Sequence, residues 1–102
     1  MTLTTARGDD ALVLLGKAVG HPLRVQILRS CAMQDRRSPS QIASELRSPL
    51  GRISYHVSLL SQWGFLDLVE TIPRRGAVEH RYRLATLARE RLEAMAPAIL
   101  QR

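Results

Sequence analysis

Residues 38–64 read SPSQIASELRSPLGRISYHVSLLSQWG, and the fold is predicted mainly from the helix signals that they contain. Ser38 begins a capping box, in which the serine caps a helix, proline takes the first helical position and Gln41 reaches back to the cap. The helix has only about two turns, because residues 47–48 form a tight turn and Pro49 starts another helix at once. Two helices joined by so short a turn form a helix-turn-helix, whose second helix enters the DNA major groove.

The second of these helices, which Gly64 ends, has two different faces. One face is an apolar stripe at intervals of three, four and three residues, which we expect to be buried: Leu50, Ile53, Val57 and Leu60. The opposite face is small or hydrogen-bonding: Gly51, Arg52, Ser54, Tyr55, Ser58 and Gln62. No Asp or Glu occurs from Arg47 to Trp63, so this face approaches phosphates without repulsion. Arg52 suits a guanine edge or a phosphate, and the hydroxyl groups suit either.

Two helices are predicted before this unit. Asp10 caps the first, over residues 11–19, and Gly20 stops it with a residue tolerant of left-handed geometry. His21 and the proline after it open the next helix. Its buried side comprises Leu23, Val25, Ile27, Leu28 and Cys31.

After Gly64 the hydrophobic period changes from 3.6 to 2. Residues 65–72 and 78–84 are rich in β-forming residues, and the turn at 73–76 carries Arg74 and Arg75, which predicts an antiparallel hairpin with a basic tip. A last helix begins at Thr86 and is kinked or ended by Pro97.

The sequence thus predicts a mainly α protein with a small β-hairpin, a winged helix-turn-helix in the order α-α-α-α-β-β-α. We expect a flexible tail over residues 1–8 and a single domain over 9–102. Within that domain lie the helix-turn-helix at 38–64, the wing at 65–84 and a dimerisation helix at 86–100.

Composition points to a nucleic-acid partner. The formal net charge is +6, and Lys17 is the only lysine, so nearly every cation is an arginine suited to phosphates and guanine. Codon usage in a GC-rich genome is an alternative source of that arginine. The single cysteine, Cys31, fits a buried thiol in a reducing compartment, and no signal peptide or membrane span is evident, so we expect a cytoplasmic protein. The sequence contains no phosphate-binding glycine loop, no nucleophile elbow and no metal-ligand cluster, so we expect that the protein is not an enzyme.

Four consecutive segments resemble the ArsR/SmtB family of winged-helix repressors: HPLRVQIL, SPSQIASEL, ISYHVSLLSQWGFL and PRRGAVEHRYRL, at residues 21–28, 38–46, 53–66 and 73–84. PLGRISYHV and RRGAVEHRYR are similar in particular to a branch of small actinobacterial regulators. The resemblance implies a homodimer on a roughly palindromic operator in double-stranded DNA.

The expected contacts follow from this resemblance and from the pattern of faces. The DNA-binding set comprises Ser38, Ser40, Gln41, Pro49, Gly51, Arg52, Ser54, Tyr55, His56, Ser58, Arg74, Arg75 and Arg81. The dimer interface comprises Leu12, Val13, Leu15, Leu87, Leu92, Met95 and Ile99.

Other features depart from the family or stay open. Metal-sensing members carry Cys-x-Cys where this chain has Ser44-Glu45-Leu46, and the last helix has acidic residues but no histidine, so we expect no metal and no cofactor. His56 is either a phosphate contact or an internal hydrogen-bonding group, and Trp63 is either core or an exposed contact. His80 with Glu79 fits a structural pair better than a ligand site. The sequence names no small-molecule effector, and the alternative function is a winged-helix module for protein contact.

Overall fold

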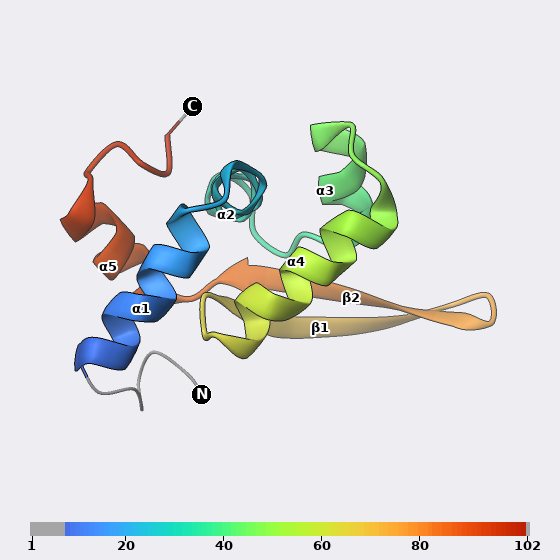
Figure 1. Ribbon diagram of the computed structural model, residues 1–102. Coiled ribbons are helices and arrows are strands. Elements are labelled where there is room, and N and C mark those ends of the chain that lie inside the picture. The colour runs from blue at the N-terminus through green and yellow to red at the C-terminus, as the bar shows by residue number, and fades with distance from the viewer. Residues whose placement is uncertain (1–7, 102) are drawn as a thin grey trace.

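The computed structural model describes residues 8–101, and within them five helices and one hairpin follow in the predicted order (Figure 1). The elements are α1 (Gly8–Val19), α2 (Pro22–Met33), α3 (Pro39–Leu46), α4 (Leu50–Gln62), β1 (Leu66–Arg74), β2 (Ala77–Leu84) and α5 (Thr86–Met95). This is the winged helix-turn-helix arrangement that the sequence predicts. The expected tail, apart from Gly8, lies outside the described residues.

The first helix differs from its prediction at both ends. It begins at Gly8, so Asp10 lies inside the helix and is not its cap. Gly20 is needed for a different reason from the one expected, because a Cβ atom there would lie 2.8 Å from the carbonyl oxygen of Gly16. Close backbone approach, and not a left-handed φ angle, therefore explains this glycine.

The helix-turn-helix forms as the capping signals predict. The Ser38 hydroxyl accepts from the Gln41 backbone N–H at 3.2 Å, and the Gln41 side-chain oxygen accepts from the Ser38 N–H at 2.9 Å. Arg47 ends α3 in the left-handed region, with φ at 52°. This conformation turns the chain sharply enough for α4 to begin three residues later, at Leu50.

The two strands pair in antiparallel register from Leu66 opposite Leu84 to Arg74 opposite Ala77, with an irregularity between Leu68 and Glu70. The connecting turn is shorter than predicted, since the strand continues through Arg74. A β-bulge increases local twist, so the hairpin curves as it leaves the body. At the other end of the chain α5 stops at Met95, before Pro97, so the predicted helix to residue 100 is too long.

The core lies between the helices and the base of the hairpin. Its largest fully buried side chains include Phe65, Ile27, Ile42, Ile53 and Leu60, which come from every layer of the helix-turn-helix and from the start of the wing. Burying each stabilises the fold by about 1.5–3 kcal/mol. Leu50 was expected in this core but is 51% exposed, and it is the first residue of α4.

Arg37 fixes the hairpin to the helices. Its backbone N–H and C=O both pair with Tyr82 on β2 at 2.8 Å, and its guanidinium donates to Glu45 of α3 at 2.6 Å. The Ser30 hydroxyl of α2 donates to the same carboxylate. In the resulting shape, 43 by 28 by 20 Å, α1 and α5 lie at one end and the hairpin tip at the other (Figure 1).

Candidate nucleic-acid interface

The exposed face of α4 is the centre of the candidate interface. Residues at helical spacing leave one ridge in solvent, which we call the recognition face: Gly51, Arg52, Tyr55, Ser58 and Gln62. The Tyr55 side chain is 60% exposed, and Ser54 lies half-buried beside it. Pro49 is exposed at the start of the helix. The predicted acid-free surface of α4 therefore does face outward.

Two residues of the expected DNA-binding set lie inside the protein. Ser38 is only 1% exposed and its hydroxyl is used by the capping box. His56 is 6% exposed, because it stands on the flank of α4 that packs toward α2. The assignment of Ser38 is therefore wrong, because Ser38 is a cap. His56 bonds to Arg24 within the fold through one ring nitrogen, and it also lines a cleft described below.

His56 belongs to a network that the sequence did not reveal. Its Nδ1 atom accepts from Arg24 Nε at 3.2 Å, and its ring lies 4.6 Å from that of His21. Arg24 also stacks over Trp63, with 4.9 Å to the ring centroid, so Trp63 is a half-buried platform for a cation. Burial, followed by the charges of His21, Arg24 and Arg52, lowers the pKa of His56.

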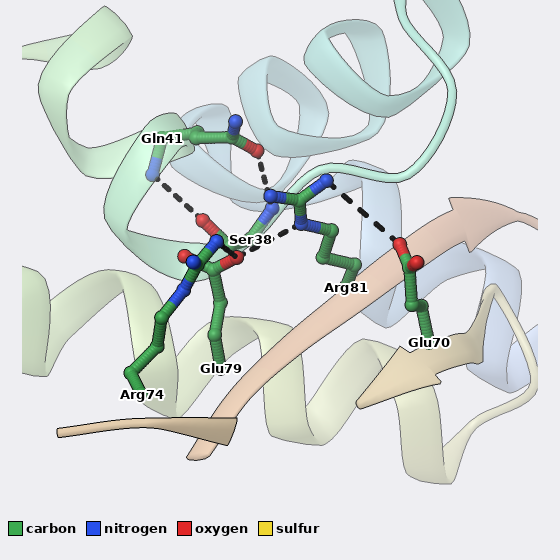
Figure 2. Close-up of polar contacts among 6 residues, drawn as sticks. All are labelled: Ser38, Gln41, Glu70, Arg74, Glu79 and Arg81. Atoms are coloured by element: carbon green, nitrogen blue, oxygen red, sulfur yellow. Dashed lines mark hydrogen bonds and ion pairs between the residues drawn. The ribbon is translucent and has the colours of Figure 1, made fainter. Parts of the chain in front are cut away.

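The start of α3 presents two further polar side chains. Ser40 and Gln41 are exposed, and they follow the capped first turn of the helix. The Gln41 oxygen is occupied by the Ser38 N–H, which orients the side chain (Figure 2).

The arginines of the wing are held by carboxylates. Glu79 accepts from Arg81 at 2.9 Å and from Arg74 at 3.3 Å, and Arg81 also lies 3.8 Å from Glu70 (Figure 2). These hydrogen bonds, the one from Arg81 first, lower the pKa of Glu79, which is therefore ionised at neutral pH. The expected pairing of Glu79 with His80 is replaced by these arginine contacts.

Two clefts flank the recognition face. The hairpin cleft, of about 420 Å³, lies between α4, the start of α3 and the hairpin, and Ser54, Ser58, Arg74 and Glu79 are among its lining residues. The α2 cleft, of about 430 Å³, lies on the other flank of α4, against the start of α2 and the turn between α3 and α4. A ridge between two grooves is the shape that a helix in a major groove requires, because a phosphate strand runs along each side.

The residues expected at a dimer interface divide into three groups. Leu12, Val13 and Met95 are exposed, by 69, 57 and 45%. The half-buried members are Leu15, Leu87 and Ile99. Leu92 is fully buried within its own chain, so its assignment to an interface is wrong.

Other chemistries have little support in residues 8–101. No group of three or more His, Cys, Asp or Glu side chains there is placed to hold a metal ion. Burial raises the pKa of the Cys31 thiol to about 12, which leaves it protonated and unreactive at neutral pH. Among the same residues no single helix has the length and apolarity for a membrane span, although residues 10–19 and α2, bent by 94°, pass such a test together.

Comparison with solved structures identifies the class of protein. One similar structure is the homodimeric winged helix-turn-helix DNA-binding domain of Mb0332 from Mycobacterium bovis, a possible ArsR-family transcriptional regulator, with 26% identity, a TM-score of 0.67 and coverage of 89% of this chain and 78% of that one. HlyU from Vibrio cholerae gives 23% identity, a TM-score of 0.65 and coverage of 90 and 99%. The transcriptional repressor BigR from Xylella fastidiosa gives 21% identity and a TM-score of 0.61, with coverage of 88% of this chain and 87% of that one.

The fold and the exposed α4 ridge therefore define a winged helix-turn-helix protein. Mb0332 is described as a possible ArsR-family transcriptional regulator, which confirms the resemblance seen in the sequence. No protein-family model matches the chain, and no curated protein is similar to it in sequence. Mb0332 is thus described as a possible transcriptional regulator, and BigR as a transcriptional repressor.

Proposed function

We propose that this protein binds double-stranded DNA sequence-specifically as a homodimer and represses transcription. The observation that carries the proposal is the recognition face, an exposed helix ridge without a carboxylate, with a cleft on each side. A major groove about 12 Å wide admits one such helix. The relatives support the proposal, since the Mb0332 domain is DNA-binding and homodimeric and BigR is a transcriptional repressor.

The proposed contacts divide by chemistry. Arg52 and Tyr55, with Ser58 beside them, face base edges in the groove, and Gly51 and Pro49 allow close approach at the start of α4. The remaining members of the set contact sugar and phosphate: Ser40, Gln41, Ser54, Arg74 and Arg75. Arg81 acts indirectly, because its guanidinium is committed to Glu79 and Glu70.

The proposed dimer uses the end of the molecule opposite the hairpin tip. Leu12 and Val13 on α1, with Met95 on α5, expose apolar surface there that a second copy would cover. Joining two copies at that end directs both wings outward. It would place two recognition helices about 34 Å apart, on successive turns of one DNA face.

The direct test selects bound duplexes from a random-sequence pool and measures their affinity against the unselected pool. We expect enrichment of a roughly palindromic site. Arg52→Ala should weaken binding to the selected duplex by about 1–3 kcal/mol and relax the preference at one base position. Arg36→Asn is the control, since Arg36 is an exposed arginine that lines neither cleft and lies outside the proposed dimer interface.

Two results would count against the proposal. A pool with no enriched sequence would favour the alternative function, a winged-helix module that contacts protein. An equal loss on selected and random duplexes for Arg52→Ala would remove this arginine from base recognition.

A further inference from the structure

The α2 cleft contains a concentration of cationic and hydrogen-bond-donating groups, and all of them except Arg52 lie outside the recognition face. Its ionisable lining residues are His21, Arg47, Arg52 and His56, and none of its lining residues is an Asp or Glu. The hairpin cleft differs in this respect, because Glu79 lines it and is bound to Arg74. Of the two clefts, the α2 cleft is therefore the one whose positive charge is not balanced by a lining carboxylate.

The wall of this cleft is arranged to donate hydrogen bonds. Because Arg24 Nε donates to Nδ1 of His56, that nitrogen carries no proton, and the neutral ring bears its hydrogen on Nε2. His21 is similar: its Nδ1 accepts from the Leu23 backbone N–H at 3.3 Å. Both rings, 4.6 Å apart, thus have Nε2 as the nitrogen left to donate.

The electrostatics agree with this geometry. After burial, the groups that lower the pKa of His56 are His21, Arg24 and Arg52, which are all bases. Arg24 is itself bound to the carbonyl of Lys17 and stacked on Trp63, so it adds positive potential behind the ring. The cleft lacks a negative group, and an anion would supply one.

The position of the cleft identifies the anion. Arg52 and His56 lie one helical turn apart on one flank of α4, while Ser54 and Ser58 lie on the flank that faces the hairpin. A duplex whose major groove holds the recognition face has a sugar-phosphate strand along each flank. The strand on the hairpin side meets the wing, and the other strand meets the α2 cleft.

We propose that the α2 cleft binds a backbone phosphate of the DNA strand on the side of α4 away from the wing. Arg47 supplies the charge, and His21 and His56 supply N–H donors. This inference rests on the proposed function, since it requires the recognition face to lie in a groove. It assigns DNA contacts to His21 at the start of α2 and to Arg47 in the turn before α4, neither of which is in the set expected from the sequence.

The test uses Arg47→Asn in the full chain. Asparagine tolerates the left-handed conformation of residue 47, so the variant removes the charge and keeps the turn. Arg36→Asn is a matched control, because Arg36 is also exposed, also has a positive φ angle, 57°, and lines neither cleft. His21→Asn is a second variant that keeps a capping oxygen for α2 while removing the imidazole.

Affinity is measured by fluorescence anisotropy on a selected and on a random-sequence duplex over a range of NaCl concentrations. We expect Arg47→Asn to weaken binding to both duplexes by about tenfold. The salt slope, which is the slope of the logarithm of the binding constant against the logarithm of the NaCl concentration, should become smaller in magnitude by about one for each α2 cleft in contact with DNA. His21→Asn should weaken both by a smaller factor. Arg36→Asn should change neither the affinity nor the slope.

Ethylation interference then locates the phosphate. The wild-type protein should be blocked by ethylation on both sides of the contacted groove, and Arg47→Asn should lose interference on one side only. If wild-type protein binds DNA but Arg47→Asn keeps the full slope and interference pattern, the phosphate assignment is overturned and the proposed function stands. If wild-type protein shows no salt-dependent DNA binding, the proposed function itself fails and takes this inference with it.

A titration with inorganic phosphate separates the two sources of this anion. The imidazole NMR signals of His21 and His56 report on the cleft without DNA. Shifts with inorganic phosphate, together with an unchanged DNA salt slope for Arg47→Asn, would mean a site for free phosphate and would overturn the DNA assignment. A reduced DNA salt slope for Arg47→Asn supports the assignment of the α2 cleft to a DNA phosphate.

Discussion

Replacing Glu79 by glutamine should strengthen DNA binding, which is the opposite of what removing a wing contact would do. Glu79 is ionised at neutral pH and holds Arg74 and Arg81, while Glu70 holds Arg81 from its other side. These four side chains carry two positive and two negative charges, so their sum is zero. Arg75 at the turn adds one positive charge to the tip. The wing is therefore far less cationic toward DNA than its sequence suggests.

The size of the effect follows from Coulomb's law. A carboxylate about 6 Å from a phosphate in water repels it enough to change a binding constant about threefold, and two wings of a dimer would give about tenfold. Glutamine has the same shape and still accepts a hydrogen bond from Arg81, so the hairpin geometry should be kept. These pairs are partly exposed, and their loss should alter folding stability little.

The assay is fluorescence anisotropy on a random-sequence duplex at low ionic strength. Glu79→Gln should bind about threefold to tenfold more tightly than wild type, and the difference should shrink as salt shortens the Debye length from about 10 Å to about 3 Å. Asp35→Asn is the matched control, because Asp35 also pairs with an arginine, Arg36, at 3.5 Å but lies off the wing. Unchanged binding by Glu79→Gln would mean that the hairpin does not approach DNA. Weaker binding would mean that Glu79 orients the arginines, and either result refutes this reasoning.

Three further predictions concern assembly and stability. Leu12→Glu should shift the protein from dimer to monomer in sedimentation, whereas Met33→Glu, at an equally exposed apolar site on α2, should not. Glu45→Gln should lower the free energy of unfolding in urea by about 1–3 kcal/mol, because it leaves the Arg37 guanidinium, 11% exposed, without its charged partner. The pKa of His56 is lowered in the folded protein, so the unfolded chain takes up a proton first as the pH falls. The free energy of unfolding should therefore decrease as the pH falls below 6.5, the ordinary pKa of the imidazole, until the lowered pKa of folded His56 is reached. His56→Gln should remove this pH dependence, which is measured by urea titrations at a series of pH values.

Most of the fold follows from local signals in the sequence. The capping box at Ser38 and the proline at position 49 predict the helix-turn-helix, and the change to a hydrophobic period of two after Gly64 predicts the hairpin. These signals act over three to five residues, within which sequence neighbours are also spatial neighbours. The errors fall where that condition fails. Leu50 continues the apolar stripe of α4 but is exposed at the first position of the helix. Periodicity within one helix does not reveal which of its apolar positions a neighbouring element covers.

The candidate site was predicted less completely, for a related reason. The exposed ridge of α4 follows from one helix alone, and its main members, Arg52 and Tyr55, are where the sequence placed them. The partner of His56 is Arg24, 32 residues away, and no pattern within α4 could identify it. The pairing of Glu79 with Arg74 likewise depends on the hairpin register, which brings residues five apart together across the turn.

The contacts of Arg37 explain how two distant elements act as one DNA-binding surface. In the proposed complex the recognition face and the wing contact different parts of a duplex, so their separation must stay fixed if both are to bind at once. Arg37 holds β2 through two backbone hydrogen bonds to Tyr82 and holds α3 through Glu45, and α3 is joined to α4 by a two-residue turn and an exposed proline. A displacement of the hairpin relative to α4 would have to break these bonds in the poorly solvated interior, where an unpaired guanidinium is costly. Arg37 therefore supports the proposed DNA-binding surface by holding its two parts in place, without itself belonging to the set of proposed DNA contacts.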